Sequence, residues 1–126
     1  KKNFVTWLID SLNSDQHVNI VTDQSGTYTY LNDLVTITMT CIENPRTGIF
    51  HVSGTEILSR YELAKLVEEL FSINNNLINP INTLKLKQRA NRPMKSGFTI
   101  DKAIREFNFK PTSIRSAINE IKELLN

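Results

Sequence analysis

The chain has 126 residues, of which 40% are hydrophobic and 22% are charged, and it carries a formal net charge of +2. A chain of this length forms one domain or part of one and can bury a sizeable core. Its basic residues are spread out and offset by 13 acidic ones, so we do not expect nucleic-acid binding. No apolar run approaches the length of a membrane-spanning helix. The single cysteine, Cys41, suits a reducing compartment such as the cytoplasm, and we expect it to be a small buried helix residue.

The first part of the chain predicts two helices separated by a short strand and a polar bend. Apolar residues recur at helical spacing over Phe4–Leu12, and Val18–Val21 is a short β-type run. After the bend, Asn32 or Asp33 can cap the second helix, because a side-chain oxygen there accepts from free amides of the first turn. That helix should end before the turn at 44–48, which contains proline and glycine.

The middle of the chain predicts one compact strand and one well-supported helix. The apolar run Ile49–Val52 predicts the strand. Because so few strands cannot form a sheet that is stable alone, we expect a partner sheet outside this chain to accept it. Ser59 and Glu62 have capping-box spacing at the start of an amphipathic helix that reaches Phe71. Residues 77–81 should be extended, and their proline argues against a central strand.

The last third predicts two more helices after an irregular basic stretch. Residues 83–95 are the least regular, and 96–100 are expected to be briefly extended. Asp101–Phe107 is typical of a short helix, and Thr112 or Ser113 can cap a final helix that has one apolar face. The expected fold class is therefore α/β, mainly helical, with few short strands.

The polar bend at 23–34 is the first candidate for ligand binding. It is rich in Asp, Gln, Ser, Thr and Tyr, and Gly26 allows a bend that a residue with Cβ would resist. A loop held between regular elements can supply ligand contacts because the scaffold fixes its position. The alternative is a solvated turn that happens to be polar.

The basic segment at 85–95 also has two interpretations. It can be a solvated loop, or Arg92 can bind a diphosphate, because a planar guanidinium presents paired donors that match phosphate oxygens. His17 and His51 share no spacing with carboxylates or thiols, so no metal site is expected, and His51 is expected to be a structural strand residue. The four glycines are too scattered for a phosphate-binding loop, so no cofactor-binding residue is expected.

Several short motifs together carry a resemblance to a known family. They are Asn3-Phe4, Asp23-Gln24, Gly26, Thr29-Tyr30, Asp33-Leu34, Arg92-Pro93 and Ser96. In this pattern the chain resembles the C-terminal part of dTDP-4-dehydrorhamnose reductases, members of the extended short-chain dehydrogenase/reductase superfamily. The resemblance covers essentially the whole chain. It implies that residues 1–126 are the substrate-binding portion of a Rossmann-type enzyme whose N-terminal dinucleotide-binding domain is absent from this chain.

The resemblance also implies an activity. The parent enzyme would reduce the C4 ketone of dTDP-4-dehydro-L-rhamnose to dTDP-L-rhamnose with NADP or NAD, bound by the missing part. This chain would hold no catalytic residue and would be inactive alone. Its partners would be a dTDP-sugar and, if the parent dimerises, a second copy in a homodimer. The implied substrate-binding residues are Asn3, Gln24, Thr29, Tyr30, Arg92 and Ser96.

Some positions depart from the family pattern or have another role. Tyr28 replaces a proline, and Leu31 replaces a small residue, which leaves the identity of the sugar nucleotide open. Asp23 and Asp33 are expected to hold the bend, since carboxylates would repel a diphosphate. In the superfamily, a tyrosine followed four residues later by lysine marks the proton donor, but we interpret Tyr61 and its lysine as coincidence. Two alternatives remain: a non-catalytic regulatory subunit, or another nucleotide-sugar epimerase or dehydratase.

Overall fold

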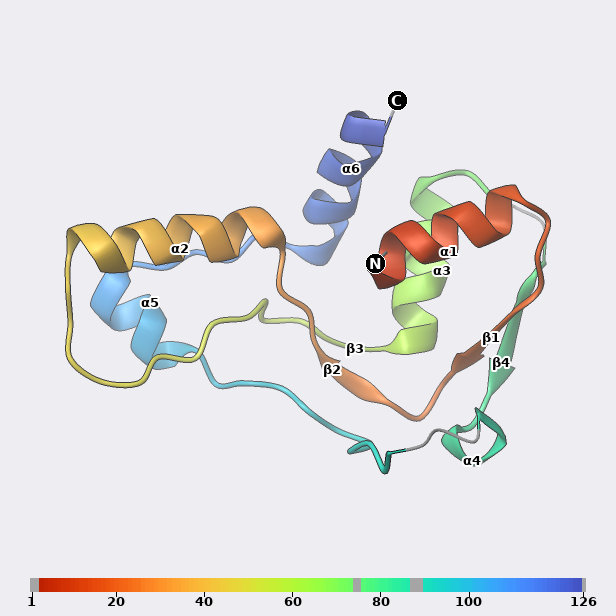
Figure 1. The fold of residues 1–126 in the computed structure, drawn as a ribbon, viewed down its shortest axis with the longest axis horizontal. Helices are drawn as coiled ribbons and strands as arrows, with labels where there is room; N and C mark the ends of the chain where they lie inside the picture. The colour runs from red at the N-terminus through yellow and green to blue at the C-terminus, as the bar shows by residue number, and fades with distance from the viewer. Residues whose placement is uncertain (1–2, 74–75, 87–89, 126) are drawn as a thin grey trace.

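Helices account for about half of the described residues, and the strands are few and short, as the sequence predicts (Figure 1). The computed structural model describes residues 3–73, 76–86 and 90–125. None of the helices in these ranges is long and apolar enough to cross a membrane. The elements, in chain order, are α1 (Phe4–Asn13), β1 (Val18–Val21), β2 (Ser25–Thr27), α2 (Leu31–Glu43), β3 (Ile57–Ser59), α3 (Arg60–Leu70), β4 (Ile78–Ile81), α4 (Thr83–Leu86), α5 (Asp101–Phe107) and α6 (Ile114–Leu125).

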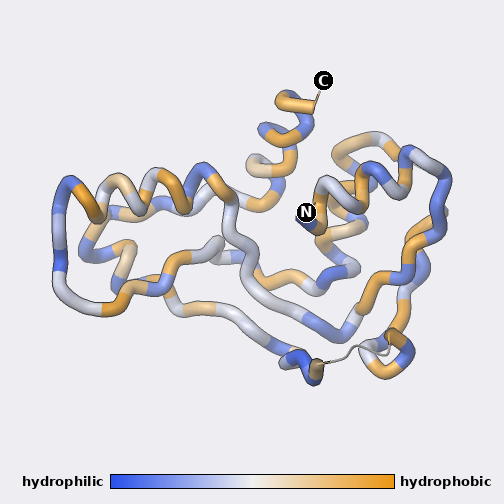
Figure 2. The backbone as a smooth tube through the Cα atoms, viewed as in Figure 1, coloured by the Kyte–Doolittle hydropathy of each residue, from blue (hydrophilic) through white to orange (hydrophobic). Residues whose placement is uncertain are grey.

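The structure has two lobes, each with its own hydrophobic core (Figure 1). The larger lobe contains α1, β1, α3 and β4, with α6 packed against it, and its buried centre includes Leu8, Leu12 and Val67. The smaller lobe places α2 beside α5, around Ile37 and Phe109. Figure 2 shows the hydrophobic stretches of β1 and β4 in the larger lobe and a hydrophilic bend directly after β1. The bend therefore lies between the two cores.

Each sheet contains two strands. β1 pairs with β4 in parallel, with Val18 opposite Ile78, and β2 pairs antiparallel with β3, with Ser25 opposite Ser59. Neither β2 nor β3 was predicted, because a three-residue strand is too short to show an alternating pattern. Two-stranded sheets are marginal alone, so packing of the helices must stabilise both.

Four of the described helices begin with a side-chain cap, and at α4 this cap is Asn82, whose Oδ1 accepts from the Lys85 amide at 3.1 Å. Asn3 Oδ1 accepts from the Thr6 amide at 3.0 Å at the start of α1. The predicted capping box is confirmed, because Ser59 Oγ accepts from the Glu62 amide while the glutamate accepts from the Ser59 amide. At α6, the Oγ of Ser113 accepts from the Ser116 amide at 3.1 Å. These bonds satisfy amides that have no partner inside the helix.

Three local predictions are wrong. The second helix begins at Leu31 and has no side-chain cap, so neither Asn32 nor Asp33 caps it. The run at 49–52 forms no strand within the described residues, and its expected pairing with a sheet outside this chain is not tested. His51 is exposed and stacks on the Phe98 ring at a centroid distance of 4.9 Å.

Other predictions hold or lie outside the described residues. Cys41 is in α2 and is partly buried against the smaller core. The irregular stretch 83–95 contains the four-residue helix α4. Its residues 87–89, and residues 74–75 after α3, lie outside the described ranges.

Asp33 connects the start of α2 to the segment that leads into α6. Its carboxylate accepts from the Thr112 amide at 2.8 Å and from the Thr112 hydroxyl at 2.7 Å. Asp33 is only 8% exposed. Since a buried carboxylate needs such donors, this link joins two segments that are far apart in the sequence. The expectation that Asp33 has a holding role is confirmed.

We expect Asp33→Asn to lower the free energy of unfolding by about 2 kcal/mol, because the amide NH₂ would face one of the two Thr112 donors. Urea denaturation followed by circular dichroism measures this loss. Asp15→Asn is the matched control, since Asp15 is exposed and has a left-handed φ of 54°, which asparagine also tolerates. Equal stability of the two variants would contradict the assignment.

Candidate functional site

The polar bend after β1 is held in place by α4. Both carboxylate oxygens of Asp23 accept from the Thr83 amide at 3.0 Å, and Asp23 Oδ1 also accepts from the Thr83 hydroxyl at 2.7 Å. The side-chain Nε2 of Gln24 donates to the same hydroxyl oxygen at 3.0 Å. The hydroxyl bond first, and then the amide bonds, lower the pKa of Asp23 below its usual range. Asp23 therefore holds the bend, as expected.

One pocket beside the bend brings together three of the six predicted substrate-binding residues. Gln24, Arg92 and Ser96 line a cavity of about 250 Å³. Ser96 lies there because its amide donates to the Ser25 carbonyl at 2.8 Å, so its segment runs along β2. Gly26 permits this approach, because a Cβ at that position would be 2.9 Å from the Ser96 carbonyl oxygen.

A second pocket contains the other three predicted residues. Asn3, Thr29 and Tyr30 line a cavity of about 390 Å³, together with apolar side chains of α6. The Tyr30 hydroxyl donates to Glu120 Oε2 at 2.9 Å and accepts from the side-chain Nδ2 of Asn32 at 2.9 Å. Desolvation, and then the bond to Glu120, raise the pKa of Tyr30. Tyr30 contributes an aromatic wall, and its polar atom already has partners within the chain.

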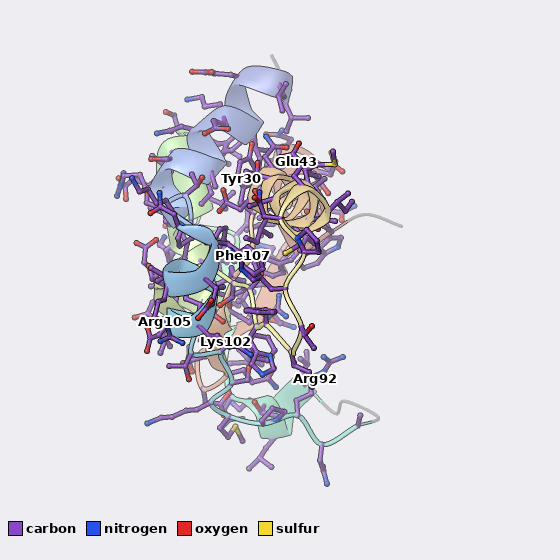
Figure 3. The ribbon with its side chains drawn as sticks, turned by 90° about the vertical axis from the view of Figure 1, so that its left-hand side faces the viewer. Tyr30, Glu43, Arg92, Lys102, Arg105 and Phe107 are labelled. Atoms are coloured by element: carbon purple, nitrogen blue, oxygen red, sulfur yellow. The ribbon has the colours of Figure 1, made fainter. Side chains whose placement is uncertain are left out.

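The six predicted residues therefore do not line one pocket. Figure 3 shows Tyr30 and Arg92 well separated, with Tyr30 in the upper half of the view and Arg92 toward its lower end. Tyr28 belongs to the walls of both cavities and connects them. The two groups lie apart because Thr29 and Tyr30 lead into α2, whereas Ser96 lies beside β2 and Arg92 precedes it on the same segment before α5.

Arg60, which the sequence analysis missed, lies at the junction of these pockets. Its guanidinium carbon is 5.1 Å from the Phe4 ring centroid and 5.7 Å from that of Tyr28. It lines the 250 Å³ cavity and a neighbouring one of about 480 Å³, in both cases together with Gln24 and Arg92. The capping box identified Arg60 as the first residue of α3, but only the fold places that helix end against the bend.

The other groups that were considered for chemistry have structural surroundings. Tyr61 packs against the larger core, and Lys65 pairs with Glu68 on the same helix. Within the described ranges, no group of three or more His, Cys, Asp or Glu side chains is placed to hold a metal ion. The pockets offer a ligand aromatic faces and guanidinium charge.

Comparison with solved structures identifies the class of protein. A dTDP-4-dehydrorhamnose reductase from Bacillus anthracis str. Ames, solved in complex with NADP, has a TM-score of 0.89 and 26% identity, covering 98% of this chain and 44% of that one. A dTDP-4-dehydrorhamnose reductase from Clostridium acetobutylicum has a TM-score of 0.88 and 25% identity, covering 99% and 44%. A Bacillus anthracis dTDP-glucose 4,6-dehydratase, only 8% identical, shares the fold with a TM-score of 0.75, covering 96% and 39%. The chain thus belongs to the extended short-chain dehydrogenase/reductase superfamily.

The family follows from the sequence comparisons. The family model of the RmlD substrate binding domain matches residues 1–126, so the chain belongs to this family of dTDP-4-dehydrorhamnose reductase substrate-binding domains. The chain is 30% identical over 118 residues to the spore coat polysaccharide biosynthesis protein SpsK of Bacillus subtilis (strain 168), covering 94% of this chain and 41% of that protein. It is 25% identical to the dTDP-4-dehydrorhamnose reductase of Aggregatibacter actinomycetemcomitans, covering 95% and 45%. The chain therefore spans less than half the length of these relatives, and the resemblance is confirmed.

The bonds from Thr83 predict a pH dependence of stability. The pKa of Asp23 is lowered in the folded state. Its ionised carboxylate therefore adds to the free energy of unfolding above about pH 4, and this stabilisation is lost as the pH falls through the folded pKa. We expect the urea midpoint of the wild type to fall more steeply than that of Asp23→Asn between about pH 5 and pH 3. Thr83→Val removes the hydroxyl and keeps the amide, so it should give an intermediate slope. Parallel profiles for all three proteins would contradict the prediction.

Proposed function

We propose that the chain is the sugar-nucleotide-binding portion of a reductase that converts dTDP-4-dehydro-L-rhamnose to dTDP-L-rhamnose. The reductant is NADPH or NADH, held by a dinucleotide-binding part that precedes this chain in a longer cytoplasmic protein. The family match and the reductase relatives support this proposal. The chain supplies substrate contacts and no catalytic residue.

The observation that carries the proposal is the 250 Å³ pocket that brings Gln24, Arg92 and Ser96 together. Arg92 is exposed, and within the described residues no acidic side chain forms a salt bridge with it. A free guanidinium beside a pocket suits an anionic ligand, and its planar fork matches phosphate oxygens. We therefore assign the diphosphate of the substrate to this pocket.

The larger, mainly apolar pocket suits the less polar end of the same ligand. Asn3 fixes the start of α1 there, Thr29 offers a hydroxyl, and Tyr30 offers a ring face. Binding sites of this kind combine apolar walls with a few polar groups that orient the ligand. Since Tyr28 lines both cavities, a ligand that extends from one to the other would pass this ring.

We expect dTDP-rhamnose to raise the Tm of residues 1–126 and Arg92→Gln to weaken that response. Ligand at ten times its Kd stabilises a fold by about 1.4 kcal/mol, which raises the Tm by roughly 5 °C for this size. Loss of a charge-assisted hydrogen bond should weaken binding at least about tenfold. Arg105→Gln, in α5, is the matched control because it removes the same charge elsewhere (Figure 3). No shift with millimolar ligand, or equal shifts for both variants, would contradict the proposal.

We also expect residues 1–126 alone to oxidise no NADPH when dTDP-4-dehydro-L-rhamnose is added, because the proposal places the dinucleotide site in the preceding part of the protein. Absorbance at the nicotinamide band measures this directly. The Bacillus anthracis dTDP-4-dehydrorhamnose reductase, assayed in parallel, shows that the substrate and the assay are competent. Substrate-dependent oxidation by the purified chain would overturn the assignment of this chain as the binding portion only.

A further inference from the structure

Three cavities of the larger lobe meet around one guanidinium. Arg60 lines the 480 Å³ and 250 Å³ cavities, and the two rings beside it, Phe4 and Tyr28, both line the 390 Å³ cavity. No other arginine in the described ranges has contacts with two aromatic rings. Arg60 therefore borders two of these cavities directly and lies against two rings that line the third.

The charge of Arg60 is not neutralised by a carboxylate among the described residues. The salt bridges of this part of the chain involve Lys65, Arg105 and Arg115. The acidic side chain closest in sequence, Glu62, accepts from the Ser59 amide in the capping box. Aromatic faces attract a guanidinium and orient it without occupying its N–H donors. The side chain is thus held in position with its charge and its donors available.

Arg60 and Arg92 come from distant parts of the sequence to the same two cavities. Arg60 is fixed through the backbone as well, since its amide donates to the Gln24 carbonyl at 3.1 Å. Arg92 arrives on the segment that runs along β2. Two guanidinium groups at one pocket repel each other unless an anion lies between them. The pair therefore favours a ligand with two phosphate groups over a ligand with one.

We propose that Arg60 is a second cationic contact for the diphosphate, acting together with Arg92, and that Phe4 and Tyr28 position it. This inference rests on the proposed function of the site and adds a specificity-determining residue to it. A diphosphate presents two phosphate groups, so each guanidinium has its own partner. Tyr28, which departs from the family pattern, supplies one of the two rings that hold Arg60.

The test compares dTDP with dTMP as ligands of the wild type, Arg60→Gln, Arg60→Lys and Arg92→Gln. Trp7 is the single tryptophan and lines the 480 Å³ cavity, so its fluorescence reports binding. We expect Arg60→Gln to lower the affinity for dTDP at least about tenfold and the affinity for dTMP much less, because the second phosphate loses its partner. The dTDP affinity of Arg60→Lys should lie between those of the wild type and Arg60→Gln, since lysine keeps the charge and loses the planar fork. The affinity of Arg105→Gln should equal that of the wild type.

A second pair of variants tests the positioning by the ring. Tyr28→Phe keeps the aromatic face and should bind dTDP like the wild type, whereas Tyr28→Leu should weaken dTDP severalfold. Circular dichroism melts of each variant separate loss of binding from loss of fold. If Arg60→Gln unfolds, Arg60→Lys is compared with the wild type in its place.

The outcomes separate this inference from the proposed function. If dTDP binds the wild type, Arg92→Gln weakens it, and both folded Arg60 variants bind as well as the wild type, the role of Arg60 is overturned and the proposed function stands. If neither dTDP nor dTDP-rhamnose binds the wild type at millimolar concentration, the proposed function fails, and this inference fails with it. Selective loss of dTDP over dTMP in Arg60→Gln supports both.

Discussion

The hydrogen bonds that Asp23 accepts from Thr83 are the constraint on which the ligand-facing part of this structure depends. They join residues 60 positions apart and fix the bend where β1 ends and β2 begins. Because Gln24 donates to the same hydroxyl, the bend cannot move without breaking several bonds. The elements around the 250 Å³ pocket adjoin this bend: β2 follows it, β3 pairs with β2 and leads into α3, and the segment after Arg92 lies beside β2.

A second carboxylate has a similar structural role at the other end of the loop. Asp33 accepts from Thr112 and so ties the beginning of α2 to the entrance of α6. With only two-stranded sheets, the lobes are joined less by sheet hydrogen bonds than by such contacts between side chains and backbone. Both aspartates hold the loop that they belong to, which keeps their charge away from an anionic ligand.

The candidate site is a set of adjoining cavities in which aromatic rings and arginines alternate. Tyr28 and Phe4 separate a mainly apolar cavity from the cavities that contain Arg92. Arg60 lines the cavities that contain Arg92 and also lies against both rings, which line the mainly apolar cavity. A sugar nucleotide has a charged centre between two less charged ends, and this order of surfaces suits it. The proposed reductase role depends on that match and on the family to which the chain belongs.

The sequence by itself determined the elements whose signals are local: α1, β1, α3 and α5, the capping box at Ser59, and the family through its short motifs. Helical periodicity and capping depend on residues a few positions apart, so they can be read from one segment. The tertiary structure alone decided that 49–52 is no strand here, that β2 pairs with β3, and that the predicted site residues divide between two pockets. It also decided the position of Arg60. Each of these depends on which distant segments meet, and that is set by packing of the whole chain rather than by the pattern within any one segment.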